Sequence, residues 1–144
     1  MRRCGAGVLL AALALLLGAG PGLSRAGLAG GVEEAPLSDP DVQEALRFAV
    51  EAYNLVSNSL YLYRAERLVR ARRQVVAGVK YILNVELVGT QCQKNGAGLG
   101  NADVSKCPLP PQSKQKKLLC ELMVWNQPWL HNMQLLSHHC SVSN

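Results

Sequence analysis

The hydrophobic positions of the chain follow two periods, one typical of a helix and one typical of strands. The helical period runs along Val42, Ala45, Leu46, Ala49, Val50 and Tyr53. This spacing predicts one helix with a single buried stripe. Asp39 and Pro40 supply a capping side chain and a first-turn proline, so the helix should begin there. Ser57-Asn58-Ser59 should end it.

From Leu60 onward, apolar and polar residues alternate, which predicts two long strands. The expected core face of the first strand is Tyr61, Tyr63, Ala65, Val69, Ala71 and Val75. That of the second strand is Val79, Tyr81, Leu83, Val85 and Leu87. The uncharged stretch between them, Gln74-Val75-Val76-Ala77-Gly78, is interpreted as a short apolar loop that projects from one end of the sheet.

The rest of the chain predicts two further strands after an irregular segment. Residues 90–113 show no periodicity and are rich in Gly, Asn, Pro and Lys, which indicates a surface excursion rather than a second domain. Leu118–Trp125 and Met133–Cys140 are the further strands, joined by a turn at Asn126–Trp129. One helix followed by antiparallel strands predicts an α+β fold, with the helix on the concave face of a twisted sheet of four to five strands.

The N-terminus has the pattern of a secretory signal peptide. Arg2 and Arg3 precede an apolar run from Val8 to Leu17, which is too short to span a bilayer as a helix. Cleavage after Ala26 would divide the chain into a signal peptide, 1–26, and one mature domain, 27–144. The protein should therefore be secreted and extracellular, with the endolysosomal system as a second location.

Removal of the signal peptide changes both the charge and the cysteine count. Three arginines and no acid are lost, so the formal net charge falls from +5 to +2, which argues against a nucleic-acid partner. Cys4 also leaves, and four cysteines remain: Cys92, Cys107, Cys120 and Cys140. An even count in an exported chain implies two disulfides, for which three connectivities exist.

Three motifs occur in a fixed order: Leu28-Ala29-Gly30-Gly31, then Gln74–Gly78, then Pro128-Trp129. With four cysteines in the C-terminal half, this order resembles the secreted (type 2) cystatins, which inhibit papain-like cysteine proteases. The helix start Asp39–Gln43 and Ser57-Asn58-Ser59 are most similar to cystatin M, with cystatin C the other close member. The resemblance implies the cystatin fold and the disulfides Cys92–Cys107 and Cys120–Cys140.

The resemblance also implies a reversible, tight-binding inhibitor that occludes the active-site cleft of papain-like proteases such as cathepsins. The residues expected to bind the protease are Leu28, Ala29, Gly30, Gln74, Val75, Val76, Ala77, Gly78, Pro128 and Trp129. Apolar contact area would supply the affinity, and no residue would act as a catalyst. For Trp129 alone, a core position is the alternative interpretation.

Asn58 resembles the residue that some cystatins offer to legumain, a protease that cuts after asparagine. The alternative is an asparagine that ends the helix in a left-handed conformation. The resemblance further implies a monomer that can form a domain-swapped dimer by opening the hairpin.

The remaining side chains favour neither an enzyme nor a metal or cofactor site. His131, His138 and His139 lack further ligands at metal spacing, and no catalytic constellation is present. Arg64, Arg67, Arg70, Arg72 and Arg73 form a basic strand face, which we interpret as solvated, with a sulfated-glycan site as the alternative. A cystatin-fold binding or antimicrobial module without inhibitory activity is the rival function.

Overall fold

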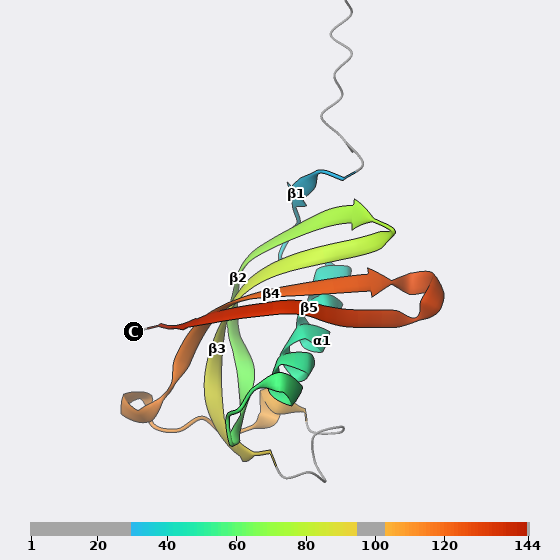
Figure 1. The fold of residues 1–144 in the computed structure, drawn as a ribbon. Coiled ribbons are helices and arrows are strands. Elements are labelled where there is room, and N and C mark those ends of the chain that lie inside the picture. Colours follow the sequence, from blue (N-terminus) through green and yellow to red (C-terminus); the bar gives the residue numbers. More distant parts are fainter. Residues whose placement is uncertain (1–29, 95–102, 144) are drawn as a thin grey trace, which may run out of the picture.

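The computed structural model describes residues 30–94 and 103–143 (Figure 1). The segment 1–26, Leu28 and Ala29 lie outside the described residues. The described elements in chain order are β1 (Val32–Glu34), α1 (Pro40–Val56), β2 (Tyr61–Val76), β3 (Gly78–Gln93), β4 (Lys117–Gln127) and β5 (Asn132–Val142), with 3-10 turns at Val104–Lys106, Gln112–Lys114 and Pro128–Leu130. The five strands form one antiparallel sheet in the order β1-β2-β3-β4-β5, which confirms the predicted α+β architecture.

The helix lies where its pattern predicted. The Asp39 carboxylate accepts a hydrogen bond of 2.8 Å from the backbone N–H of Asp41, and Pro40 opens the first turn. The Ser57 N–H closes the last turn on the Tyr53 carbonyl oxygen at 2.8 Å. The predicted stripe is buried, except that Leu46 is only partly covered.

The helix lies across the concave face of the sheet, and the core fills the space between them (Figure 1). Fully buried side chains on the sheet include Leu83, Val85, Leu87, Leu122 and Val124. The ring of Tyr53 meets that of Tyr63 edge to face at 6.0 Å, which joins the end of α1 to the start of β2.

The predicted core face of β2 is wrong in part. Val69 is 43% and Tyr61 is 42% exposed, whereas Leu62 is buried and Leu68 packs against the core. The register of β2 against β3 shifts within Tyr61–Tyr63, Ala65–Arg67 and Leu68–Arg70. The second and third shifts each add one residue to β2 that the simple alternation does not count, so the core face changes from odd to even positions and back.

The loop between β2 and β3 is shorter than predicted. Val75 pairs with Val79 and Val76 pairs with Gly78, so only Ala77 lies outside the two strands. The stretch from Gln74 to Gly78 is therefore the tip of a continuous ribbon rather than a five-residue loop. Strand β3 also continues to Gln93, so the irregular segment begins later than Thr90.

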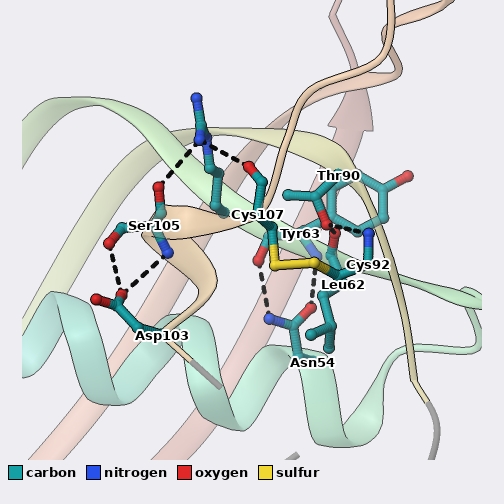
Figure 2. Close-up of a disulfide and its surroundings, with 9 residues drawn as sticks. Asn54, Leu62, Tyr63, Thr90, Cys92, Asp103, Ser105 and Cys107 are labelled. Atoms are coloured by element: carbon teal, nitrogen blue, oxygen red, sulfur yellow. Dashed lines mark hydrogen bonds between the residues drawn. A yellow bond between two sulfur atoms is a disulfide. The ribbon is translucent and has the colours of Figure 1, made fainter. Parts of the chain in front are cut away.

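Both predicted disulfides are present. Cys92 is bonded to Cys107 across the irregular segment, with a Cα–Cα distance of 5.8 Å (Figure 2). Cys120 is bonded to Cys140, and these residues are direct partners in the β4–β5 register. Each bridge should stabilise the fold by about 3 kcal/mol through restriction of the unfolded chain.

Candidate functional site

The N-terminal glycine lies against the first hairpin. Val32 pairs with Gln74 at the end of the β1–β2 register, which brings Gly30 beside the tip of β2. The Gln74 amide Nε2 donates a hydrogen bond of 2.5 Å to the Gly30 carbonyl oxygen. Gly30 has a φ of +92°, a backbone conformation that favours glycine.

The two hairpin tips lie at the same end of the sheet (Figure 1). The β3–β4 register ends at the pair Val79 and Asn126. Ala77 and Pro128 each lie two residues from this pair, beyond the end of the paired strands. A direct contact joins the hairpins, because the indole Nε1 of Trp125 donates a hydrogen bond of 2.8 Å to the carbonyl oxygen of Ala77. We call the surface formed by Gly30, Val75, Val76, Ala77 and Trp129 the apolar edge.

Gly78 permits the close approach of the two hairpins. Its φ is +99°, and a Cβ atom added there would lie 2.2 Å from the carbonyl oxygen of Asn126. Backbone atoms cannot be moved aside as a flexible side chain can, so any larger residue must displace β4 or the hairpin tip.

Pro128 begins the second tip, and Trp129 projects from it. Pro128–Leu130 form a 3-10 turn that His131 closes with a φ of 47° and an N–H donated to the Pro128 carbonyl oxygen at 3.0 Å. Trp129 is 60% exposed, so the interpretation as a core tryptophan is wrong. The exposed Leu130 follows it.

The apolar edge offers contact area without charge. Val75 is 55% and Val76 is 41% exposed, and Ala77 is exposed as well. Residues 74–79 and 125–130 include no acid, lysine or arginine. Burial of such a surface against a partner removes apolar area from water without the cost of desolvating a charge.

Asn58 lies at the other end of β2, in a loop that its neighbours hold in place. The Ser57 and Ser59 hydroxyls accept hydrogen bonds from the backbone N–H groups of Ser59 and Tyr61, at 3.1 and 3.2 Å. The Lys94 ammonium donates to the Ser57 carbonyl oxygen at 2.7 Å, and the Lys94 N–H donates to the Leu60 carbonyl oxygen at 2.8 Å. Burial lowers the pKa of Lys94.

The backbone conformation of this loop tests whether Asn58 ends the helix in a left-handed conformation. Ser57, the residue that follows the helix, is extended with φ −69° and ψ 143°. Within residues 30–94 and 103–143, the single non-glycine residue with positive φ is His131. The interpretation of Asn58 as a left-handed helix end is therefore wrong, and its side chain is exposed to solvent.

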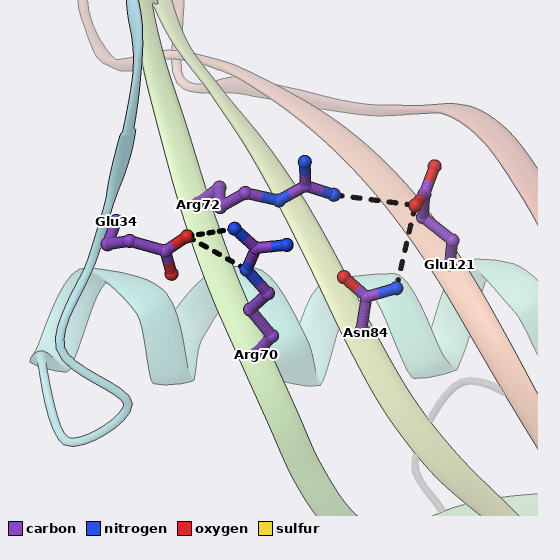
Figure 3. Close-up of polar contacts among 5 residues, drawn as sticks. All are labelled: Glu34, Arg70, Arg72, Asn84 and Glu121. Atoms are coloured by element: carbon purple, nitrogen blue, oxygen red, sulfur yellow. Dashed lines mark hydrogen bonds and ion pairs between the residues drawn. The ribbon is translucent and has the colours of Figure 1, made fainter.

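The five strand arginines do not form a free basic patch. Arg64 donates to the carbonyl oxygens of Ser105 and Cys107, at 3.1 and 3.0 Å. The other four arginines form the ion pairs Arg67–Glu86, Arg70–Glu34, Arg72–Glu121 and Arg73–Glu33. Arg73 also pairs with Asp39. Figure 3 shows the pairs of Arg70 and Arg72. A sulfated-glycan site would have to displace these acceptors, so the structure argues against it.

The described part of the chain offers neither a membrane-spanning helix nor a cluster of metal ligands. No helix there is long and apolar enough to cross a membrane. No group of three or more His, Cys, Asp or Glu side chains in residues 30–94 and 103–143 is arranged to hold a metal ion.

Three side chains that the sequence did not indicate help to hold these sites in place. They are Trp125, which joins the hairpins, and Asn54 and Lys94, which hold the loop of Asn58. Asn54 could have been noticed, because it is an amide adjoining the apolar stripe at the last turn of the helix. The roles of Trp125 and Lys94 depend on pairing between distant segments, which no local pattern reveals.

The sequence and the fold are both similar to those of known proteins. The cystatin domain family matches residues 30–129. A protein named cystatin from Oxyuranus microlepidotus is 43% identical over 113 residues, which are 78% of this chain and 80% of the relative. Cystatin-1 from Crotalus adamanteus is 44% identical over 122 residues, 84% of this chain and 88% of the relative. The crystal structure of dimeric human cystatin F superposes with a TM-score of 0.71 at 30% identity, covering 84% of this chain and 93% of that one.

Proposed function

The chain belongs to the cystatin family, whose members inhibit cysteine proteases and are not enzymes, and from this premise we propose that it reversibly and tightly blocks papain-like proteases such as cathepsins. The subtype, cystatin M or cystatin C, stays a prediction, because the two sequence relatives carry the names cystatin and cystatin-1. Secretion after cleavage near Ala26 is part of the proposal and rests on the signal-peptide pattern.

The observation that carries the proposal is the apolar edge itself. Three segments that are far apart in the sequence, at residues 30, 75–77 and 129, supply one uncharged surface at one end of the sheet. A monomeric protein gains nothing in stability from the exposure of Val75, Val76 and Trp129 there. A narrow protease cleft would cover this surface and exclude water from it.

Inhibition would proceed by occlusion alone. Val75, Val76 and Ala77 would enter the cleft as a thin ribbon, and Trp129 would cover the cleft beside them with a large rigid ring. Gln74 would act indirectly, because its amide is already bonded to Gly30. Because no covalent bond forms, the protease should recover full activity when the complex dissociates.

The residues before Gly30 would extend the same surface. Leu28 and Ala29 lie outside the described residues, and their role in the substrate-side pockets rests on the family resemblance. A chain that begins at Val32 should therefore bind papain more weakly than the chain that begins at Gly27.

A titration of papain and several cathepsins with the purified mature protein tests the proposal. We expect stoichiometric loss of activity, recovery after dissociation, and release of the inhibitor uncleaved. If papain and the cathepsins stay active at micromolar inhibitor, the proposal fails and the rival, a cystatin-fold module without inhibitory activity, takes its place. A double variant, Val76→Asp with Trp129→Ala, serves as the negative control, since both side chains are exposed and the fold should survive.

A second candidate function is inhibition of legumain through Asn58. It is favoured by the exposed Asn58 side chain on a loop that four hydrogen bonds hold in place, which would reduce the cost of ordering the loop on binding. Asn58→Ala should abolish legumain inhibition and leave papain inhibition unchanged, and Trp129→Ala should do the reverse. If either substitution weakens both activities equally, the two-site proposal is wrong.

The proposed inhibitor would act as a monomer, and exchange of a hairpin between two chains would remove its activity. A swap that opens the β2–β3 ribbon would straighten the turn at Ala77 and so destroy the tip. Mild heating followed by size-exclusion chromatography tests this. A dimer without papain inhibition supports the swap, and a chain that stays monomeric contradicts it.

A further inference from the structure

We propose that Arg70 and Arg73 are positioning residues of the inhibitor, which hold β1 and so set the direction in which the N-terminal segment meets a bound protease. The inference rests on the proposed inhibition and adds to it two residues that lie outside the apolar edge. Neither side chain belongs to the motifs that the family resemblance supplied.

Little besides these arginines holds strand β1 itself, although Ala35, the next residue, is buried in the core. It is three residues long and forms the edge of the sheet, and all three of its side chains are exposed. No apolar burial by Val32, Glu33 or Glu34 therefore fixes its position, and short edge strands are the first parts of a sheet to detach. The backbone supplies three paired positions and a hydrogen bond of 2.9 Å from the Ala35 N–H to the Ala71 carbonyl oxygen.

Two arginines of β2 hold both acids of β1. The Arg70 guanidinium donates from Nε, at 2.8 Å, and from Nη2 to the same Glu34 carboxylate oxygen (Figure 3). Arg73 donates from Nε to Glu33 at 3.2 Å and from Nη1 to Asp39 at 3.4 Å. Because Asp39 caps α1, Arg73 joins β1, β2 and the helix start at one point.

The register explains why these contacts fix direction. Arg73 lies directly opposite Glu33, whereas Arg70 lies two positions beyond Arg72, the direct partner of Glu34. One direct pair and one diagonal pair resist both sliding and rotation of a three-residue strand. Gln74 then continues the series by its bond to Gly30, so contacts hold the segment from residue 30, before β1, to residue 34 at its end.

Such exposed pairs contribute little to global stability, and this makes the proposal testable. The side chains of Arg70 and Glu34 are 53% and 61% exposed, and surface pairs of this kind have small effects on unfolding. Loss of the pairs should therefore weaken the attachment of β1 to β2 and should hardly change the unfolding midpoint. Arg67→Gln is the matched control, because Arg67 pairs with Glu86 of β3 and not with β1.

The test is a double-mutant cycle on papain inhibition. Arg70→Gln and Arg73→Gln are combined in the chain that begins at Gly27 and in a chain that begins at Val32. In the longer chain we expect an inhibition constant about three- to tenfold higher, and in the shorter chain no change. The exchange of charges by Glu34→Arg with Arg70→Glu should restore part of the loss that each single substitution causes. Equal losses in both backgrounds, or none in the longer one, would overturn the proposal.

A measurement on the free protein separates this proposal from the proposed function. The double arginine variant should speed hydrogen exchange of the Ala35 amide at least several-fold, with unchanged protection of β3 and β4, and Arg67→Gln should not. If the unaltered chain does not inhibit papain, the proposed function fails whatever the exchange result. If the chain inhibits papain and Ala35 exchange is unaffected, the arginines do not hold β1.

Discussion

The indole Nε1 of Trp125 donates a hydrogen bond of 2.8 Å to the carbonyl oxygen of Ala77, and this contact joins the two hairpins that carry the apolar edge. Ala77 is the single residue between β2 and β3, so its carbonyl group has no strand partner. Trp125 thus fixes the tip of one hairpin from the stem of the other. The two hairpins are held together in the free chain, and binding of a protease by the proposed surface would therefore cost less entropy.

Trp125→Phe tests this contact, because it keeps an aromatic ring and removes the donor. The Ala77 carbonyl is at the surface, so water can replace the indole and the unfolding midpoint should hardly change. The tip should become more mobile, and we expect the papain inhibition constant to rise about two- to tenfold. Inhibition kinetics and thermal unfolding measure the two effects. An unchanged inhibition constant would show that the bond does not prepare the edge.

Trp129→Ala should weaken papain inhibition strongly without destabilising the protein. The ring is 60% exposed in the free chain, so its removal creates no cavity. Tryptophan at the centre of an interface commonly contributes 2 kcal/mol or more, so we expect a loss of about 30-fold or greater. Leu130→Ala, at the neighbouring residue of similar exposure, is the control. Equal losses for the two variants would mean that the tip acts by general hydrophobicity and not through Trp129.

Gly78→Ala should damage both the fold and the activity. The added Cβ would meet the Asn126 carbonyl oxygen at 2.2 Å, and alanine disfavours a φ of +99°. We expect a loss of stability of about 1–3 kcal/mol by urea unfolding and a parallel loss of papain inhibition. Gly89→Ala is the matched control in the same strand, where the nearest atoms would lie at 3.6 Å. If the two variants are equally stable, the close approach at Gly78 is not a constraint.

The parts of the fold that follow a regular period could be predicted from the sequence, and the parts that depend on pairing could not. The helix from Pro40 to Val56 matches its stripe and its cap, because both signals are local. The core positions of β3 match as well, since its alternation is uninterrupted from Val79 to Leu87. In β2, the register shifts around Glu66 and Val69 reverse the alternation, and nothing in the composition of that strand marks them.

In the candidate site, too, local features could be predicted from the sequence, whereas features that depend on pairing between distant segments could not. The apolar, uncharged tip at Val75–Ala77 can be read from the residues themselves, and its closeness to Gly30 and Pro128 follows once the antiparallel order is known. The five arginines misled the reading of charge, because their carboxylate and carbonyl partners come from β1, β3, β4 and the segment around Cys107. Only the tertiary structure shows that four of these arginines have carboxylate partners and that Arg64 bonds to backbone carbonyl oxygens.

The ionisation of Glu34 should report the attachment of β1. The hydrogen bond from Arg70 is the main cause that lowers the pKa of Glu34, helped by the charges of Arg70 and Arg72. A carboxylate with a depressed pKa stabilises the docked state above its ordinary pKa of about 4.3, and that contribution is lost as the pH falls through the lower value. The contribution of the Arg70–Glu34 pair to the docking of β1 should therefore persist at pH values near 4.3 and be lost only below them.

An NMR titration of the Glu34 carboxyl carbon measures this pKa. The midpoint should lie below 4.3 in the unaltered protein and return toward that ordinary value in Arg70→Gln. Arg67→Gln should leave it in place, since Arg67 pairs with Glu86. A midpoint that does not move in Arg70→Gln would contradict the pairing of Arg70 with Glu34.

Asn54→Ala should destabilise the protein and weaken the proposed legumain site more than the proposed papain site. The Asn54 amide is 2% exposed and replaces a strand partner for Tyr63, donating to its carbonyl oxygen and accepting from its N–H, each at 2.8 Å (Figure 2). Alanine would leave two buried backbone groups unpaired, at a cost of about 2–4 kcal/mol in urea unfolding.

The same substitution also frees the chain that leads to Asn58. Asn54 fixes Tyr63 to the last turn of α1, and the loop of Asn58 lies between these two anchors. The apolar edge lies at the far end of β2, so legumain inhibition should fall by a larger factor than papain inhibition in the fraction that remains folded. Asn58→Ala is the control for stability, since its side chain is exposed and its loss should leave the unfolding curve unchanged. Equal factors for the two proteases would mean that Asn54 acts on the fold as a whole and does not position the loop.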